Sequence, residues 1–163
     1  MSEIVVLKIG GNEVDDDAFL SGLARAIAAL RTRCAPVVVH GGGKEIARLQ
    51  QALGLEPRFV DGLRVTDEET LALTEMVLSG AVNKRLVARF LAHGVPAVGL
   101  SGVDGGLLRA RRLVHPSGDL GWVGEVTEVD PTLPRLILGQ GMVPVVSPVS
   151  LGPEGRPYNV NAD

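Results

Sequence analysis

The chain has 163 residues, of which 45% are hydrophobic but only 3% aromatic, and its formal net charge at pH 7 is −3. This length suits one domain with an aliphatic core. The acidic balance argues against a nucleic-acid-binding protein, which needs a concentrated basic face. The basic residues Arg109, Arg111 and Arg112 form only a short run, which is interpreted as the solvated face of a strand.

Membrane and secretory proteins are also disfavoured by the sequence. No apolar stretch approaches the ~20 residues of a membrane span, and the first residues lack the pattern of a signal peptide. The single cysteine, Cys34, excludes an internal disulfide and fits a reducing compartment. We therefore expect a soluble, cytoplasmic protein that binds neither nucleic acid nor membrane.

The first half of the chain alternates between strands and helices. Short β-branched runs at residues 3–9 and from Pro36 onward predict two buried strands. A helix from Asp15–Asp17 to about Arg31 follows the first strand, with acidic residues at its start. A second helix is expected from Gly43 to about Leu53. This order predicts a parallel sheet covered by helices on both faces.

A hairpin and a long helix are expected next. Residues 58–65 predict a hairpin that turns at Asp61-Gly62. Thr66 and Glu69 have the spacing of a capping box, which predicts a helix from there to His93. Apolar residues nearly encircle this helix, so it should be buried on more than one side and could contact another subunit.

The remaining sequence predicts a strand at Ala97–Leu100, glycine-punctuated hairpins at 106–129, a helix at 131–139 and a buried strand at Met142–Ser147. The expected fold class is therefore α/β, with a mainly parallel sheet sandwiched by helices and with added β-hairpins. The last residues resemble a strand end followed by a helix N-cap, with no helix after it. We expect that the chain is the first part of a longer protein.

Two glycine-rich turns each follow a predicted strand. The first is Lys8-Ile9-Gly10-Gly11-Asn12, and the second is His40-Gly41-Gly42-Gly43-Lys44-Glu45. Glycine lets the backbone approach a ligand closely, and a following helix adds the positive end of its dipole. Two such turns with a lysine indicate a cradle for anionic oxygens, and hence phosphoryl chemistry. The alternative is that the glycines only permit tight connections.

Several better-known site motifs are absent from the sequence. A P-loop would need Ser or Thr after Gly43-Lys44, where Glu45 stands. The dinucleotide fingerprint fails because Ile46 stands where its third glycine belongs. The three histidines and the single cysteine are too scattered to predict a metal site.

Four segments together resemble the acetylglutamate kinases of the amino acid kinase superfamily. They are Lys8-Ile9-Gly10-Gly11, His40-Gly41-Gly42-Gly43, Phe59-Val60-Asp61-Gly62-Leu63-Arg64-Val65-Thr66 and Asn159-Val160-Asn161-Ala162-Asp163. The resemblance implies an amino acid kinase-like (carbamate kinase-like) fold. It also implies phosphorylation of the side-chain carboxylate of N-acetyl-L-glutamate by ATP with Mg²⁺, in arginine biosynthesis. Residues 1–163 would be the N-terminal amino-acid-binding and dimerisation domain, with the ATP-binding domain beyond them.

The resemblance also assigns roles to individual residues. The implied catalytic residues are Lys8, Gly11, Gly43 and Asp163. The implied substrate-binding residues are Gly42, Gly43, Arg64 and Asn159. The residues implied to bind the co-substrate ATP are Lys8, Gly10 and Gly11. A carboxylate nucleophile is already ionised at neutral pH and needs no general base, so His40 is interpreted as structural.

Two other functions remain open from the sequence. One is a related kinase that acts on carrier-protein-linked aminoadipate, and the other is a non-catalytic module that binds an amino acid or dimerises. Because the chain begins almost at its first strand, the resemblance further implies a homodimer that arginine does not inhibit.

Overall fold

A four-stranded parallel sheet forms the centre of the fold. The computed structural model describes residues 3–11 and 13–163. The strand order is β1-β2-β8-β5, and the strands span Ile4–Ile9, Ala35–His40, Val143–Ser147 and Ala97–Ser101, respectively. All three pairings are parallel, as the alternating strands and helices predicted.

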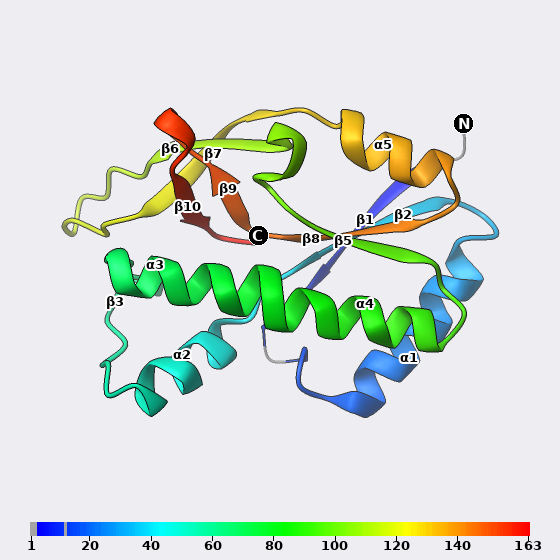
Figure 1. The fold of residues 1–163 in the computed structure, drawn as a ribbon, viewed down its shortest axis with the longest axis horizontal. Coiled ribbons are helices and arrows are strands. Elements are labelled where there is room, and N and C mark those ends of the chain that lie inside the picture. Colours follow the sequence, from blue (N-terminus) through cyan, green and yellow to red (C-terminus); the bar gives the residue numbers. More distant parts are fainter. Residues whose placement is uncertain (1–2, 12) are drawn as a thin grey trace.

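Helices cover both faces of this sheet (Figure 1). On one side lie α1 (Asp17–Leu30), α2 (Gly43–Ala52) and the long helix that includes α4 (Asn83–Ala92), and on the other lies α5 (Thr132–Gly139). The larger core packs the first group against the sheet and includes the fully buried residues Leu20, Ile27, Leu86 and Phe90. A smaller core joins α5 to the opposite face through Ile137, Leu100 and Val146. The predicted sandwich is confirmed.

The long helix is continuous but not uniform. It consists of α3 (Glu68–Glu75), a π-helical segment at Met76–Val82 and α4. The sequence predicted one helix to His93 and did not predict the π-helical segment. A π turn holds more residues than an α turn and so rotates the residues that follow it. Asn83, the first residue of α4, is completely buried against the sheet.

The capping box predicted for this helix is wrong by one residue. The N-cap is Asp67, whose Oδ1 accepts a hydrogen bond of 2.9 Å from the Thr70 N–H. That hydrogen bond lowers the pKa of the Asp67 carboxyl. Thr66 is instead fully buried. Its backbone N–H donates to Leu120 O and its carbonyl accepts from the Trp122 N–H.

The hairpin region forms a second, smaller sheet. β6 (Leu108–Arg112) and β7 (Val123–Val129) pair antiparallel, which confirms the expected hairpin. β9 (Val149–Leu151) and β10 (Pro157–Val160) then close these strands into a small barrel in the order β10-β7-β6-β9. This closure was not predicted from the sequence. The short β3 (Phe59–Val60) and β4 (Leu63–Arg64) form the predicted hairpin.

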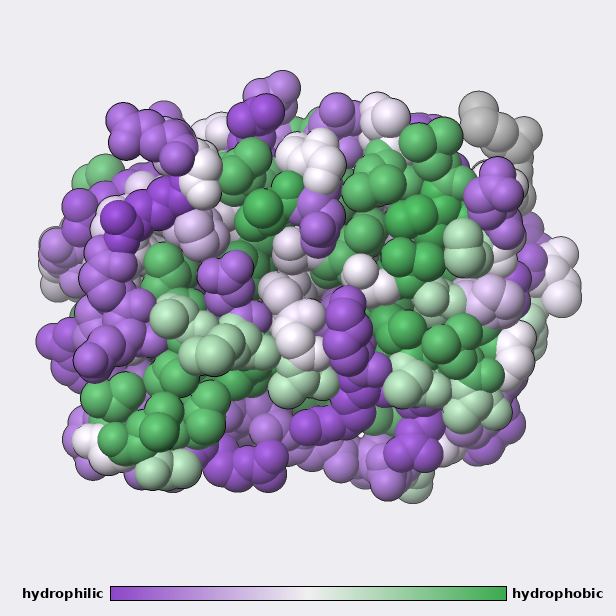
Figure 2. All heavy atoms as spheres, in the orientation of Figure 1, coloured by the Kyte–Doolittle hydropathy of each residue, from purple (hydrophilic) through white to green (hydrophobic). Residues whose placement is uncertain are grey.

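Charged and apolar side chains are mixed over the surface. Each arginine of the predicted basic run is paired with an acid, as in the 2.8 Å contact between Arg111 Nε and Glu125 Oε1. Figure 2 shows separate apolar patches among hydrophilic side chains on one face. The exposed large apolar residues include Leu53, Phe59, Met76 and Leu91. No helix within residues 3–11 and 13–163 is long and apolar enough to cross a membrane.

Replacing the N-cap residue tests the corrected start of α3. Asp67→Ala removes the acceptor for the Thr70 N–H and should lower the free energy of unfolding by about 1 kcal/mol. Asp67→Asn keeps an equivalent acceptor and serves as the control. Urea unfolding of both variants checks this, and an equal loss in the two would contradict the assignment of Asp67 as the N-cap.

Candidate functional site

The pairing of β1 with β2 brings the two glycine turns together. The strands are parallel and in register, with Ile9 opposite His40, so both end at the same edge of the sheet. The Gly41 N–H donates a 3.0 Å hydrogen bond to Ile9 O, directly after the paired residues. Open parallel sheets generally bind ligands at this carboxyl edge.

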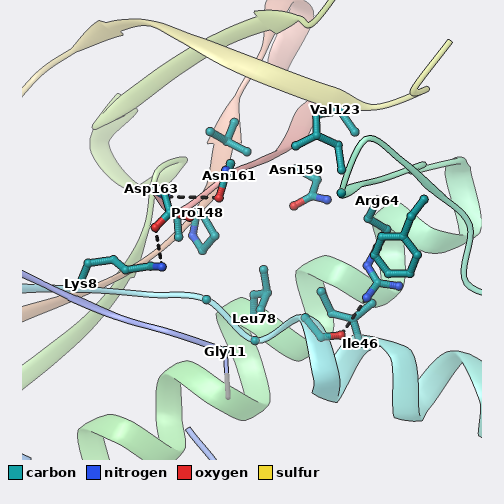
Figure 3. A pocket seen from close by; sticks show the side chains of 18 residues that line it. Lys8, Gly11, Ile46, Arg64, Leu78, Val123, Pro148, Asn159, Asn161 and Asp163 are labelled. Carbon is teal, nitrogen blue, oxygen red and sulfur yellow. Dashed lines mark hydrogen bonds and ion pairs between the residues drawn. The ribbon is translucent and has the colours of Figure 1, made fainter. Parts of the chain in front are cut away.

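A cavity of about 340 Å³ lies at this edge (Figure 3). Its wall combines the two turns with residues from β3–β4, the long helix and the C-terminal strand β10. The lining residues include Lys8, Gly11, Gly42, Gly43, Arg64, Leu78, Val123, Pro148, Asn159, Asn161 and Asp163.

Lys8 and Asp163 form an ion pair on one side of the cavity. Lys8 Nζ lies 2.5 Å from Asp163 Oδ1, although the residues are at opposite ends of the chain (Figure 3). The Asp163 N–H donates to Asn161 Oδ1 at 3.3 Å, which fixes the backbone of this turn. Both charged side chains remain solvent-accessible, at 41% and 65%.

Backbone N–H groups form the floor of the cavity. A Cβ atom added to Gly11 would lie 2.9 Å from both Gly42 N and Gly43 N, so these nitrogens converge on the same small space. Among the described residues, neither N–H donates a hydrogen bond. Gly43 is also the first residue of α2, whose positive dipole end therefore faces the cavity. The arrangement favours a bound anion.

Arg64 is held rigidly on the far wall. It is 8% exposed, and burial lowers the pKa of its guanidinium. Its Nη2 donates to Gly43 O at 2.8 Å, its Nη1 donates to Gln50 Oε1, and the guanidinium carbon lies 4.7 Å from the centroid of the Phe59 ring. A guanidinium has five N–H donors, so further donors are left for a ligand.

Asn159 connects the cavity to the barrel. Its Nδ2 donates to Thr66 Oγ1 at 3.1 Å, and Thr66 Oγ1 donates to Arg64 O at 3.0 Å. These hydrogen bonds use the Nδ2 end of Asn159, and among the described residues no partner is found for its Oδ1. Figure 3 shows this oxygen on the side of the cavity that faces Asn161 and Pro148. Arg64 and Asn159 therefore offer donors and an acceptor to the same cavity.

The structure thus brings nearly all the sequence-predicted site residues to one cavity. Lys8, Gly11, Gly42, Gly43, Arg64, Asn159 and Asp163 line it. Gly10 does not, and a Cβ there would meet Glu13 Oε2 at 2.4 Å. Asn12, the last residue of the first turn motif, lies outside the described residues.

Gln50, which orients Arg64, was not predicted from the sequence. Gln50 is 2% exposed, and its Nε2 also donates to Thr70 Oγ1 at 3.1 Å. A polar residue one helical turn after the buried Ile46 was the available signal, because it falls on the apolar face of α2.

Within the described ranges, 3–11 and 13–163, no group of three or more His, Cys, Asp or Glu side chains could hold a metal ion. The cationic and N–H groups of the cavity suit an anion.

Comparison with known proteins identifies the family. Residues 3–163 match the model of the amino acid kinase family, so the chain belongs to that family. It is 54% identical to a protein of Roseiflexus sp. (strain RS-1) named acetylglutamate kinase, over 98% of this chain. The match spans only 60% of that relative's length.

Solved structures support the same fold. The protein smu.665 from Streptococcus mutans UA159 superimposes with a TM-score of 0.85 at 28% identity, covering 99% of this chain and 65% of that one. N-acetylglutamate synthase from Neisseria gonorrhoeae, complexed with coenzyme A and N-acetyl-glutamate, superimposes with a TM-score of 0.81 at 28% identity. That match covers 98% of this chain and 37% of the synthase.

Removing the carboxamide of Gln50 tests the support of Arg64. Gln50→Leu leaves a buried guanidinium N–H without its acceptor and should lower the free energy of unfolding by about 1–3 kcal/mol. The neighbouring Gln51 is exposed, so Gln51→Leu is a matched control that should change stability by less than about 0.5 kcal/mol. Equal urea midpoints for the two variants would show that Gln50 does not support Arg64.

Proposed function

We propose that this chain is the amino-acid-binding part of an acetylglutamate kinase. In this proposal it binds N-acetyl-L-glutamate and supplies one half of the phosphoryl-transfer site, while residues beyond 163 bind ATP. The main support for the proposal is that a lysine, converging N–H groups and a buried arginine line the same cavity. The 54% identity to a protein named acetylglutamate kinase supports the choice of substrate.

The proposed reaction joins two anions. The side-chain carboxylate of N-acetyl-L-glutamate attacks the γ-phosphorus of ATP, the bond from that phosphorus to the bridging oxygen breaks, and ADP leaves with the electron pair. The products are an acyl phosphate and ADP. The carboxylate is ionised at neutral pH, so no residue needs to remove a proton. The rate then depends on positioning and on neutralising charge.

Each cavity group has a place in this reaction. Lys8 contacts the transferring phosphoryl group and is oriented by Asp163. The N–H groups of Gly11, Gly42 and Gly43 donate to the phosphoryl and attacking oxygens. A preorganised donor of this kind is typically worth about 2.7–4 kcal/mol in the transition state. Magnesium accompanies ATP as part of the co-substrate.

Arg64 and Asn159 hold the rest of the amino acid. The guanidinium can pair with the α-carboxylate through two parallel hydrogen bonds. Gln50 and Gly43 O already fix its plane, so little side-chain entropy is lost on binding. Asn159 offers its amide to the acetamide or the carboxylate.

The proposal extends to the setting of the enzyme. We place it in the cytoplasm, in arginine biosynthesis, as a homodimer. Exposed apolar side chains such as Met76 on the long helix provide surface for a subunit contact.

A non-catalytic amino-acid-binding module is the second candidate. It is favoured by the likeness to N-acetylglutamate synthase, a protein that is not named as a kinase. A kinase that acts on carrier-linked aminoadipate fits the same cavity chemistry, and only a substrate comparison separates it from the proposal.

The deciding experiment uses the longer protein that contains this chain. ATP-dependent acyl-phosphate formation is trapped with hydroxylamine, with N-acetyl-L-glutamate and carrier-linked aminoadipate as alternative substrates. The proposal expects activity with N-acetyl-L-glutamate. Activity with the carrier-linked substrate alone would favour the aminoadipate kinase, and binding without turnover would favour the non-catalytic module.

Substituting Lys8 tests its contact with the transferring group. Lys8→Met should lower kcat about 10²–10³-fold, as expected for losing one charge-stabilising group, with little change in KM for N-acetyl-L-glutamate. Lys44 belongs to the second glycine turn but is exposed and does not line the cavity. Lys44→Met is therefore the control and should keep kcat within about twofold. Similar kcat values for the two variants would remove Lys8 from the mechanism.

A further inference from the structure

A buried polar pair lies directly beneath the second glycine turn. His40 and Asn83 are both completely buried, yet neither lines the cavity. Asn83 Nδ2 lies 3.1 Å from His40 Nε2, and His40 Nδ1 lies 2.9 Å from Gly41 O. Because buried polar groups are costly unless they are paired, these contacts fix the state of both side chains.

The strand carbonyls determine how the Asn83 amide is oriented. Asn83 Nδ2 lies 2.9 Å from Val145 O and 3.3 Å from Leu100 O, and carbonyl oxygens can only accept. The NH₂ group must therefore be at this end of the amide. Asn83 Oδ1 in turn accepts from Lys84 Nζ at 3.1 Å.

Gly99 provides the space for this orientation. A Cβ atom added to Gly99 would lie 1.9 Å from Asn83 Oδ1, which no side chain could tolerate without displacing the amide. The site on β5 therefore accommodates Asn83 only because it has a glycine.

The orientation of Asn83 selects one tautomer of His40. Asn83 Nδ2 cannot accept a hydrogen bond, so a proton on His40 Nε2 would face another donor. Gly41 O beside Nδ1 can only accept, so both contacts place the ring proton on Nδ1. Nδ1–H then donates to Gly41 O. Burial lowers the pKa of His40, which agrees with a neutral ring.

Holding Gly41 O determines where the next N–H points. In a trans peptide the carbonyl and the following N–H point in opposite directions. With Gly41 O directed at the buried His40, the Gly42 N–H points away from it. Gly42 N and Gly43 N each lie 2.9 Å from a Cβ position at Gly11, and all three glycines line the cavity.

We propose that His40 is a positioning residue for phosphoryl transfer: its Nδ1–H tautomer, fixed by Asn83, holds the Gly41 carbonyl and so aims the Gly42 N–H at the reacting anions. This inference rests on the proposed function for its catalytic consequence. His40 itself touches neither substrate, and it carries no proton to or from the reaction.

The tautomer is measured first, on this chain with uniform ¹⁵N labelling. Long-range ¹H–¹⁵N correlation spectra distinguish a protonated ring nitrogen from an unprotonated one. The proposal expects a protonated Nδ1 and an unprotonated Nε2 for His40 at neutral pH. A protonated Nε2, or a ring charged at both nitrogens, would overturn it whatever reaction the protein catalyses.

Kinetics of the longer protein then test the consequence. His40→Leu removes the donor to Gly41 O and should lower kcat about 10²-fold, the size expected for one lost oxyanion donor. KM for N-acetyl-L-glutamate should change less than about threefold, since Arg64 and Asn159 are untouched. His40→Asn can place an amide N–H near the position of Nδ1 and should recover most of kcat.

A second histidine provides the matched control. His93 Nδ1 also lies 2.9 Å from a backbone carbonyl, Arg89 O, but at the end of α4 away from the cavity. His93→Leu should leave kcat unchanged.

Equal kcat values for His40→Leu and His40→Asn, per folded molecule, would overturn the positioning role. A wild-type protein that forms no acyl phosphate would instead reject the proposed function, and the tautomer measurement would still decide whether His40 holds Gly41.

Discussion

The parallel pairing of β1 with β2 is the constraint on which the site depends. With Ile9 opposite His40, both strands end together, and two glycine turns that are far apart in the sequence become neighbours. A slip of one residue would reverse the faces of β1 and turn Lys8 away from the cavity. The buried Val38 and Ile9 hold this register from the core side.

The groups around the cavity differ in what they contribute. Arg64 with Gln50, and His40 with Asn83, form two buried hydrogen-bonded pairs, which rigidify the walls and floor. The ion pair of Lys8 with Asp163 is exposed, and exposed ion pairs contribute little to stability. This ion pair therefore contributes little to folding.

The sequence predicted the parts of the fold that local patterns determine. Apolar runs and acidic first turns located the sheet strands and their helices to within a few residues. Closure of the barrel by β9 and β10 was missed, because such short strands are stabilised by partners distant in the chain. The sequence predicted Thr66 as the N-cap instead of Asp67, because threonine and aspartate are both good N-cap residues. Only the backbone hydrogen bonds of Thr66 with Leu120 and Trp122 show that Thr66 lies outside the helix.

The candidate site was predicted mainly through motifs. Lys8, the glycines, Arg64 and Asn159 fall in segments that resemble one family, whereas Gln50 and Asn83 have no local motif. Gln50 matters because the fold places the Arg64 guanidinium beside it. Asn83 matters because the fold places the His40 ring and two strand carbonyls beside it. Such long-range contacts are not visible as a pattern in one sequence.

The most direct test of the cavity is a titration of this ¹⁵N-labelled chain with N-acetyl-L-glutamate, followed by NMR. Saturable shifts should concentrate on the backbone N–H groups of Gly11, Gly42 and Gly43 and on the Arg64 side chain, and N-acetyl-L-aspartate should produce weaker ones. Shifts confined to other surfaces, or the same response to both compounds, would contradict the assignment of this cavity as the amino-acid site.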